Sequence, residues 1–171
     1  MQLIKTHRTI RIEPDGIFAP ASITGRLTAE GPRPSDGHTA DVQVRPSATL
    51  ITTSASALAA NETKVRFVVL DSVSGEPVAD PVEGVGSDLV YNATINIPAA
   101  KTWSIPRPYL YTLTTTVIDV TIGGVVIDSV NTTLGLRSLN FTGSGGLFLN
   151  QQHVKVRGER ACERVCMRFL L

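Results

Sequence analysis

The side chains whose types could support acid–base chemistry are a few carboxylates in turn-like stretches. Asn61-Glu62 places a carboxylate beside an amide, while Asp119 and Asp128 flank Gly123-Gly124 and could face each other across a hairpin. Two converging carboxylates can serve as general acid and base, or as a nucleophile. However, Asn61-Glu62 reads as a turn before a strand, and aspartates beside a hairpin usually cap the turn. Without a convergent histidine, lysine or further carboxylate, we predict no catalytic residue in this chain.

A second chemical possibility is metal binding by Cys162 and Cys166, the two cysteines of the chain. A zinc site would need His153 and a fourth ligand, at a spacing that matches no known zinc motif. The GSGG stretch Gly143–Gly146 has the spacing of neither a nucleophile elbow nor a phosphate loop. We therefore predict neither a metal nor a cofactor.

Asparagine spacing suggests covalent modification. Four of the six asparagines begin Asn-x-Ser/Thr sequons, whereas roughly one is expected by chance. These possible N-glycosylation sites are Asn61, Asn92, Asn131 and Asn140. The excess favours a secreted glycoprotein. The alternative is a cytoplasmic protein whose threonine-rich strands produce sequons by composition, and the N-terminal residues lack the apolar core of a secretory signal.

Composition and charge exclude several classes of partner. The 171 residues are 42% hydrophobic and carry a formal net charge of +1. This length suffices for one domain with its own core. A nearly neutral chain has no bulk electrostatic reason to bind nucleic acid, and no apolar run approaches the roughly 20 residues of a membrane span. We expect neither nucleic acid nor a membrane as a partner.

Hydrophobic residues alternate with a period of two, which indicates strands. In Thr63–Asp71, for example, Val65, Phe67 and Val69 share one face. Gly123-Gly124 predicts a two-residue hairpin turn. Strand-like runs recur about every ten residues: 48–58, 63–71, a short edge strand following 72–80, 88–97, 109–120, 125–131, 133–141, and two short strands within 146–158. This spacing is typical of an antiparallel β-sandwich, so we predict an all-β fold of seven to eight strands.

The stretch Trp103–Leu113, WSIPRPYLYTL, contains the only tryptophan. Pro106 and Pro108 fix φ and remove two amide donors, so this stretch is expected to enter a sheet from its edge. Trp103 could be a platform on which a sugar stacks, or a core or corner residue beside the prolines. We favour the corner, because no second aromatic residue flanks Trp103 in a platform pattern.

Three motifs occur in a fixed order from Trp103 onward. The first is a W-S…P-x-L-Y-x-L strand entry, the second is G-L-R, and the third is L-N followed by V-K-V-R-G. Together they resemble the immunoglobulin-like domain of glycoside hydrolase family 2, the β-galactosidase, β-glucuronidase and β-mannosidase group. The residues that carry the resemblance are Trp103, Pro106, Pro108, Tyr109, Tyr111, Gly135, Arg137, Leu149, Asn150, Arg157 and Gly158.

The resemblance implies an immunoglobulin-like sandwich that accompanies a jelly-roll domain and a (β/α)8 barrel. In this family the two carboxylates that hydrolyse O-glycosyl bonds lie on the barrel, so the chain is expected to be an inactive accessory fragment. Residues 1–38 would be a linker or the last strands of the jelly roll. Residues 39–145 would be the sandwich, 146–158 a hairpin leading toward the barrel, and 159–171 a tail unlike the family.

Two departures from the family pattern concern the C-terminal third. The turn after Leu149-Asn150 has Gln151 where the family usually has glycine, which predicts a longer or strained loop. In the tail, Arg160, Arg164 and Arg168 recur every four residues, as on a solvated face of a short helix.

The role of one side chain and two alternative functions of the chain stay open at this point. Arg137 could pair with a carboxylate at a domain interface or be solvated. A standalone adhesion or carbohydrate-binding sandwich and a small enzyme of another type are the alternatives to the accessory domain.

Overall fold

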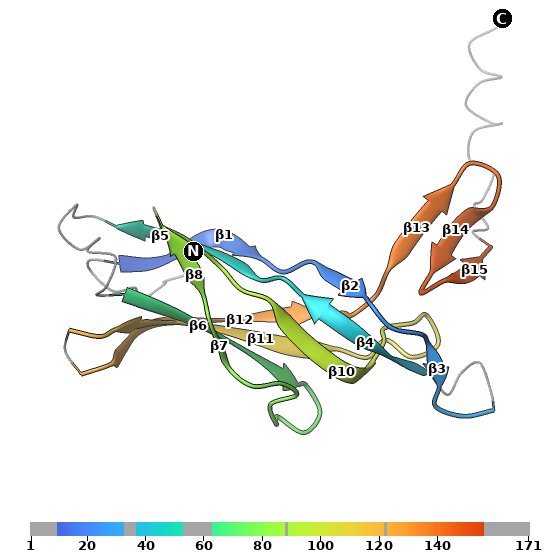
Figure 1. Cartoon of the computed structure of the whole chain (residues 1–171), viewed down its shortest axis with the longest axis horizontal. Helices are drawn as coiled ribbons and strands as arrows, with labels where there is room; N and C mark the ends of the chain where they lie inside the picture. Colours follow the sequence, from blue (N-terminus) through green and yellow to red (C-terminus); the bar gives the residue numbers. More distant parts are fainter. Residues whose placement is uncertain (1–9, 33–36, 53–62, 88, 122, 156–171) are drawn as a thin grey trace, which may run out of the picture. The chain divides into compact units, whose positions relative to one another are not determined.

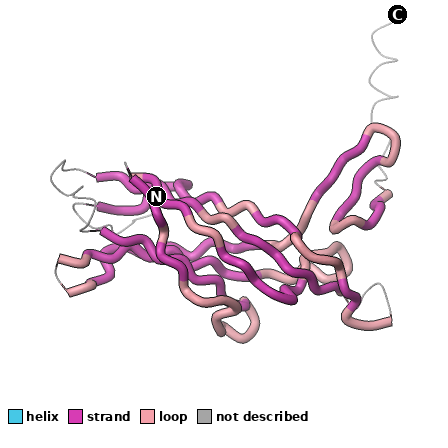
Figure 2. Tube along the Cα trace, in the orientation of Figure 1, coloured by secondary structure: helices cyan, strands magenta, loops and turns pink. Residues whose placement is uncertain are grey.

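The computed structural model of the chain describes residues 10–32, 37–52, 63–87, 89–121 and 123–155. Every regular element within these ranges is a strand (Figure 2). The chain divides between Ser138 and Leu139 into two units, which we call the sandwich unit and the C-terminal sheet. Arg157, Gly158 and the tail 159–171 lie outside the described residues.

One layer of the sandwich unit consists of two sheets that follow each other along the strands (Figure 1). The first has the order β1-β5-β9-β8: Ile10–Phe18, Ser47–Thr52, Val90–Asn92 and Val85–Ser87. The second has the order β10-β4-β2, with β3 also pairing with β4: Ile95–Lys101, His38–Val44, Ala21–Ile23 and, for β3, Thr28–Ala29. The chain passes from one sheet to the other at Arg45-Pro46, between β4 and β5.

The other layer is a single antiparallel sheet of order β12-β11-β6-β7: Val125–Leu134, Tyr111–Asp119, Thr63–Asp71 and Val82–Glu83. Gly123 and Gly124 have φ of 82° and 80°. Only glycine adopts such angles without steric cost, which explains the pair in the β11–β12 hairpin. The expected two-residue turn is wrong, because Asp119 pairs with Val125 and residues 120–124 form the loop. Register is continuous along β11 and β6, from Tyr111 opposite Asp71 to Asp119 opposite Thr63.

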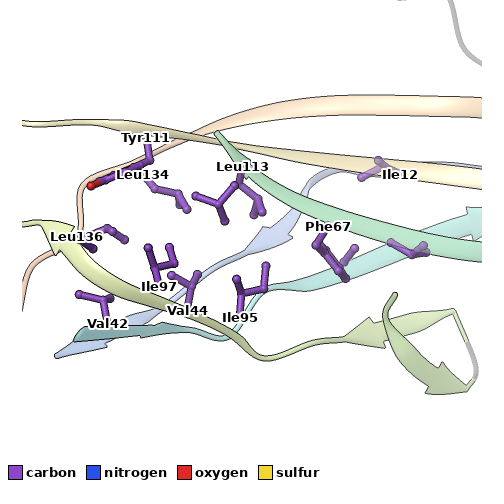
Figure 3. Close-up of a cluster of buried hydrophobic side chains, with 14 of the residues drawn as sticks. Ile12, Val42, Val44, Phe67, Ile95, Ile97, Tyr111, Leu113, Leu134 and Leu136 are labelled. Atoms are coloured by element: carbon purple, nitrogen blue, oxygen red, sulfur yellow. The ribbon is translucent and has the colours of Figure 1, made fainter. Parts of the chain in front are cut away.

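The hydrophobic core lies between the layers (Figure 3). In one layer the core side chains are Val42, Val44, Ile95 and Ile97, which point toward Phe67 and Leu113 of the other layer. These six side chains are at most 3% exposed. Alternate residues of each strand supply these contacts, as the period of two predicts. The sequence-based all-β fold class is confirmed, and the strand arrangement is that of an immunoglobulin-like sandwich.

Residues 10–29 differ from the expectation that everything before residue 39 is a linker or another domain. Ile10 and Ile12 are 6% exposed in the core of the sandwich unit, and β1 pairs with β5. Pro14 and Gly16 occupy a register shift between Ile12 and Ile17. A bulge absorbs residues that a regular strand could not hold.

The expected strand 88–97 is divided into β9 and β10, which belong to different sheets. The N–H of Ala93 donates to the carbonyl of Pro46 at 2.9 Å, at the point where the neighbouring strand also changes sheet. The expected strands 125–131 and 133–141 also have different bounds in the structure. The first extends to Leu134 as β12, and Gly135 ends it before the next strand begins at Leu139.

The C-terminal sheet has the order β13-β14-β15: Leu139–Thr142, Gly146–Leu149 and Gln152–Val154. Leu149 pairs with Gln152, so only Asn150 and Gln151 form the turn, with φ of 49° and 65°. Two positive φ values are those of a type I′ turn. Of the two alternatives, the longer loop is wrong: the turn is tight and places a non-glycine residue in a left-handed conformation.

Candidate functional site

The family motif around Trp103 forms a corner between the two layers. We define the corner as the crossover 102–110, which joins β10 to β11, together with Gly135–Arg137, Lys101, Tyr111 and Asp71. Thr102, 1% exposed, donates from both its N–H and Oγ1 to the carbonyl of His38, at 2.8 and 3.0 Å. The N–H of Trp103 donates to the carbonyl of Leu136 at 2.8 Å. The crossover is thus tied to both layers at its start.

Trp103 is half-buried and packs on the segment that follows β12. A Cβ added to Gly135 would lie 3.2 Å from Cδ1 of the indole, so glycine permits this close approach. The guanidinium carbon of Arg137 lies 4.7 Å from the centre of the indole ring, a cation–π contact. Arg137 is exposed and lies over the indole of Trp103. Its pairing with a carboxylate at a domain interface stays a prediction.

The prolines shape the middle of the crossover. Ser104 and Arg107 exchange backbone hydrogen bonds of 3.0 and 3.2 Å around Ile105-Pro106. The N–H of Tyr109 donates to the carbonyl of Arg107 at 2.8 Å, closing a three-residue turn around Pro108 whose geometry suits the fixed φ of proline. Both prolines are exposed and precede β11, which is a central strand. We expected this stretch to enter a sheet from its edge, and this expectation is wrong for β11, the strand that follows the prolines.

Four titratable side chains gather beneath the crossover. Oη of Tyr109 donates to Oδ2 of Asp71 at 2.5 Å, and Nζ of Lys101 donates to Oη of Tyr109 at 3.3 Å. The hydrogen bond from Tyr109 lowers the pKa of Asp71, and burial, followed by the bond to Asp71, raises the pKa of Tyr109. The rings of Tyr109 and Tyr111 meet edge to face at 5.4 Å.

Tyr111 begins β11 and links it back to β10. Its side chain is 2% exposed, and its Oη accepts the N–H of Lys101 at 2.8 Å. Burial raises the pKa of Tyr111 to about 12. Immunoglobulin-like folds contain a comparable tyrosine corner, in which the hydroxyl bonds to the backbone a few residues upstream, whereas the partner of Tyr111 is ten residues upstream. These polar groups bond to one another, an arrangement suited to holding the two layers together.

The other carboxylates singled out from the sequence do not converge. Oδ2 of Asp128 accepts the N–H of Ile12 at 2.8 Å, which joins the edges of β12 and β1. Oδ1 of Asp119 accepts the N–H and Oγ1 of Thr121, so it caps the hairpin. Because Asp119 lies opposite Val125 and Asp128 opposite Val117, the two aspartates do not face each other.

A groove of about 610 Å³ lies between the bulge of β1 and the edge of β12. Its size is within the range of ligand pockets. Its lining includes Arg11, Glu13 and Asp128 but no aromatic side chain. Stacking of a sugar ring on an aromatic residue is therefore unavailable there.

The remaining predicted residues are scattered over the structure. Asn92, Asn131 and Asn140 are exposed on strands, whereas Asn61 lies outside the described residues, as do Glu62, Cys162 and Cys166. His153 meets the ring of Phe148 edge to face in the C-terminal sheet, where Leu149 and Asn150 are buried. The described part of the chain brings no three potential metal ligands together. It also contains no helix long and apolar enough to cross a membrane.

Two residues of the corner were missed from the sequence. Asp71 and Lys101 look like ordinary strand-end charges, and Asp71 is 38 residues from the tyrosine to which it bonds. The position of Lys101, two residues before Trp103, was the one local signal for this cluster, and by itself it does not predict which residue the lysine contacts.

Comparison with known proteins gives a consistent family. The profile of "Glycosyl hydrolases family 2" matches residues 10–137. A search of curated protein sequences finds no match. Among solved structures, the β-glucuronidase of Bifidobacterium dentium is 21% identical with a TM-score of 0.62, over 83% of this chain and 20% of that one. A β-glycosidase from Bacteroides vulgatus is 18% identical with a TM-score of 0.66, over 89% and 16%.

A family 2 member from Bacteroides cellulosilyticus is similar at 19% identity and a TM-score of 0.64, over 87% of this chain and 18% of that one. At these identities the likeness shows the fold. The chain spans a fifth or less of the length of these three structures. The profile covers most of the sandwich unit, and its match ends at Arg137, the last residue of the corner. The chain therefore belongs to glycosyl hydrolase family 2.

Proposed function

We propose that this chain is a non-catalytic accessory domain of a family 2 β-glycosidase, an enzyme that hydrolyses O-glycosyl bonds in carbohydrate metabolism. The observation that carries the proposal is the use of three described aspartates within the fold. Asp71 bonds to Tyr109, Asp128 to the backbone of β1, and Asp119 to its own turn. Retaining hydrolysis needs two carboxylates about 5 Å apart on either side of a sugar, and these three are engaged elsewhere.

The corner supplies a mechanical role for such a domain. The chain leaves the sandwich through Gly135–Arg137, and Leu136 is fully buried while its carbonyl accepts the N–H of Trp103. Arg137 lies on the indole one residue later. The motif thus fixes the point at which the chain leaves the sandwich unit. A fixed exit supports the jelly-roll and barrel domains that we propose as its partners, because catalytic geometry tolerates little misplacement.

Hydrolysis assays test the accessory role. The purified chain is incubated with aryl β-galactoside, β-glucuronide and β-mannoside, beside a complete family 2 enzyme as positive control. We expect release of the aryl group at the background rate. Turnover that is lost in Asp71→Asn or Asp128→Asn, with the fold retained by circular dichroism, would overturn the proposal.

The sequons support a second proposal, on location: the protein is made in the secretory pathway and carries N-linked glycans. Asn92, Asn131 and Asn140 are exposed, which is compatible with attached sugars. The test is the mass of the chain secreted from eukaryotic cells. A mass increase removed by a peptide N-glycosidase supports the proposal, and an unmodified secreted chain contradicts it.

A further inference from the structure

The C-terminal sheet has one apolar face. Residues directly opposite each other in an antiparallel ladder lie on the same face of the sheet. Two rows of paired residues cross the three strands on this face, and most of their side chains are apolar. The rows are Leu139, Leu149 and Gln152, followed by Phe141, Leu147 and Val154. A sheet face of this composition is normally buried against a second layer.

The apolar face is only partly covered. Leu149, in the central strand, is 8% exposed, whereas Leu139 and Phe141 of β13 are 60% and 78% exposed. The opposite face carries Phe148 and His153, whose rings meet edge to face. Because a three-stranded sheet is stable only when its hydrophobic face is buried, the face that needs a covering layer is the one that carries Phe141.

The sequence that follows β15 has the pattern of an element that could cover this face. On the 3.6-residue period of an α-helix, residues 159–171 have an apolar stripe beside the stripe of three arginines. The apolar stripe consists of Ala161, Cys162, Val165, Cys166 and Phe169. Glu159 at the start and Arg168 near the end match the charge preference of a helix dipole. The stripe is a property of the sequence, since this segment lies outside the described residues.

The lengths of the connection and of the segment suit the apolar face. The strand β15 ends at Val154, and Lys155 is the last described residue. Residues 155–158 would then connect the strand to the helix, and connections of about two to six residues are the usual length. A helix over 159–171 would be about 20 Å long, which is enough to cross three strands spaced about 4.8 Å apart.

We infer that residues 159–171 form an amphipathic helix that packs on the apolar face of the C-terminal sheet. Cys162 and Cys166 lie against the sheet, and the arginines are directed toward the solvent. The tail, which is unlike the family, thereby supplies the second layer that buries Leu139 and Phe141. The inference is independent of the proposed accessory role, because it concerns how the chain completes one of its own units.

The reactivity of the two cysteines tests the packing in the full chain. Cys162 and Cys166 are alkylated with iodoacetamide under native conditions and in denaturant, and each site is followed by mass spectrometry. We expect alkylation of the native chain to be at least roughly tenfold slower than in denaturant. Phe141→Asp places a charge in the apolar face and should abolish this protection. Asn140→Asp, which places the same charge on the opposite face, should preserve it.

Equal rates in the native and denatured wild-type chain would overturn the inference and leave the face for another domain. Protection that survives Phe141→Asp in a folded chain would overturn it as well. Hydrogen exchange of the β13 and β14 amides gives a second readout. Deletion of residues 159–171 should accelerate this exchange, and unchanged exchange would contradict the packing.

A cross-link keeps the test decisive if Phe141→Asp unfolds the sheet. Phe141→Cys and Asn140→Cys are each made with Cys162→Ala and, separately, with Cys166→Ala, so that one native cysteine remains. Mild oxidation should join position 141 to the tail within one chain in at least one background, and position 140 in neither. Equal cross-linking from both positions, or none from Phe141→Cys, would overturn the inference. Disulfides between chains, or thiol protection that falls on dilution, would identify a second copy as the occupant and overturn it too.

Discussion

The corner and the β1–β12 side close the same sandwich in different ways. At the corner, backbone and side-chain bonds from Thr102, Trp103 and Tyr111 join both layers to the exit segment. On the other side, Asp128 accepts the N–H of Ile12, and a groove separates the strands beyond it. The difference teaches that the residues by which the family is recognised serve the more extensively bonded closure, at the point where the chain leaves the sandwich unit.

The largest effect is expected from removing the centre of the corner. Trp103→Ala deletes the contacts with Gly135 and Arg137 and should lower the free energy of unfolding by about 2–3 kcal/mol, because the indole is only half-buried. Trp103→Phe keeps a ring beneath Arg137 and should lose less. Chemical denaturation followed by far-UV circular dichroism measures both, and equal stability of Trp103→Ala and wild type would contradict the corner.

A pH dependence is expected from the same region. The pKa of Tyr111 is about 12 in the folded chain, above the usual value of 10.0, so folding favours the protonated phenol. Its contribution is complete below about pH 10 and is lost as the pH rises from 10 through 12. Tyr111→Phe should cost about 1 kcal/mol at neutral pH, because the N–H of Lys101 loses its acceptor, and should weaken the alkaline decline.

Denaturation of wild type and Tyr111→Phe at pH 8, 10 and 11 checks this sign. Tyr109 and Tyr91 also have raised pKa values, so some decline remains in the variant. Identical slopes for the two proteins above pH 10 would show that Tyr111 keeps an ordinary pKa.

A smaller effect is expected on the β1–β12 side. Asp128→Ala leaves the N–H of Ile12 without its acceptor in a part-buried position and should cost about 1 kcal/mol. Hydrogen exchange at the amide of Ile12 should accelerate, while the amide of Trp103 at the corner keeps its protection. Equal acceleration at both amides would mean that the two closures are not independent.

The smallest effect is expected outside both regions, in the β14–β15 turn of the C-terminal sheet. Gln151→Gly produces the Asn-Gly pair that type I′ turns prefer and removes a positive φ of 65° from a non-glycine residue. The β14–β15 hairpin should gain about 0.5–1 kcal/mol, seen as slower hydrogen exchange of its amides. The unfolding transition of the sandwich unit should not move, which makes this variant a baseline for the others.

Local patterns were sufficient for much of the fold. The period of two in Thr63–Asp71 corresponds to β6, and the glycine pair at 123–124 correctly marked the β11–β12 hairpin but not the length of its loop. Contacts distant in sequence were not predictable. The division of 88–97 depends on a bond from Ala93 to Pro46, and the place of β1 in the sandwich depends on a bulge that holds Pro14.

The candidate site was likewise predictable only in part. The motif residues from Trp103 to Tyr111 were identified as a group from the sequence. Tyr109 bonds to Asp71, Arg107 forms an ion pair with Glu30, and Trp103 bonds to the carbonyl of Leu136. These partners come from segments that a linear pattern cannot bring together. Arg137 illustrates the limit, because its contact with the indole of Trp103 was not predicted from the sequence.

Fluorescence of Trp103 distinguishes a structural corner from a sugar-binding surface, since the chain contains one tryptophan. Titration of the folded chain with galactose, glucuronate and mannose should leave the emission unchanged, and denaturant should shift it in the same transition as the far-UV circular dichroism. A saturable change with any of the sugars, or a tryptophan transition that precedes the loss of β-structure, would contradict the structural role of the corner.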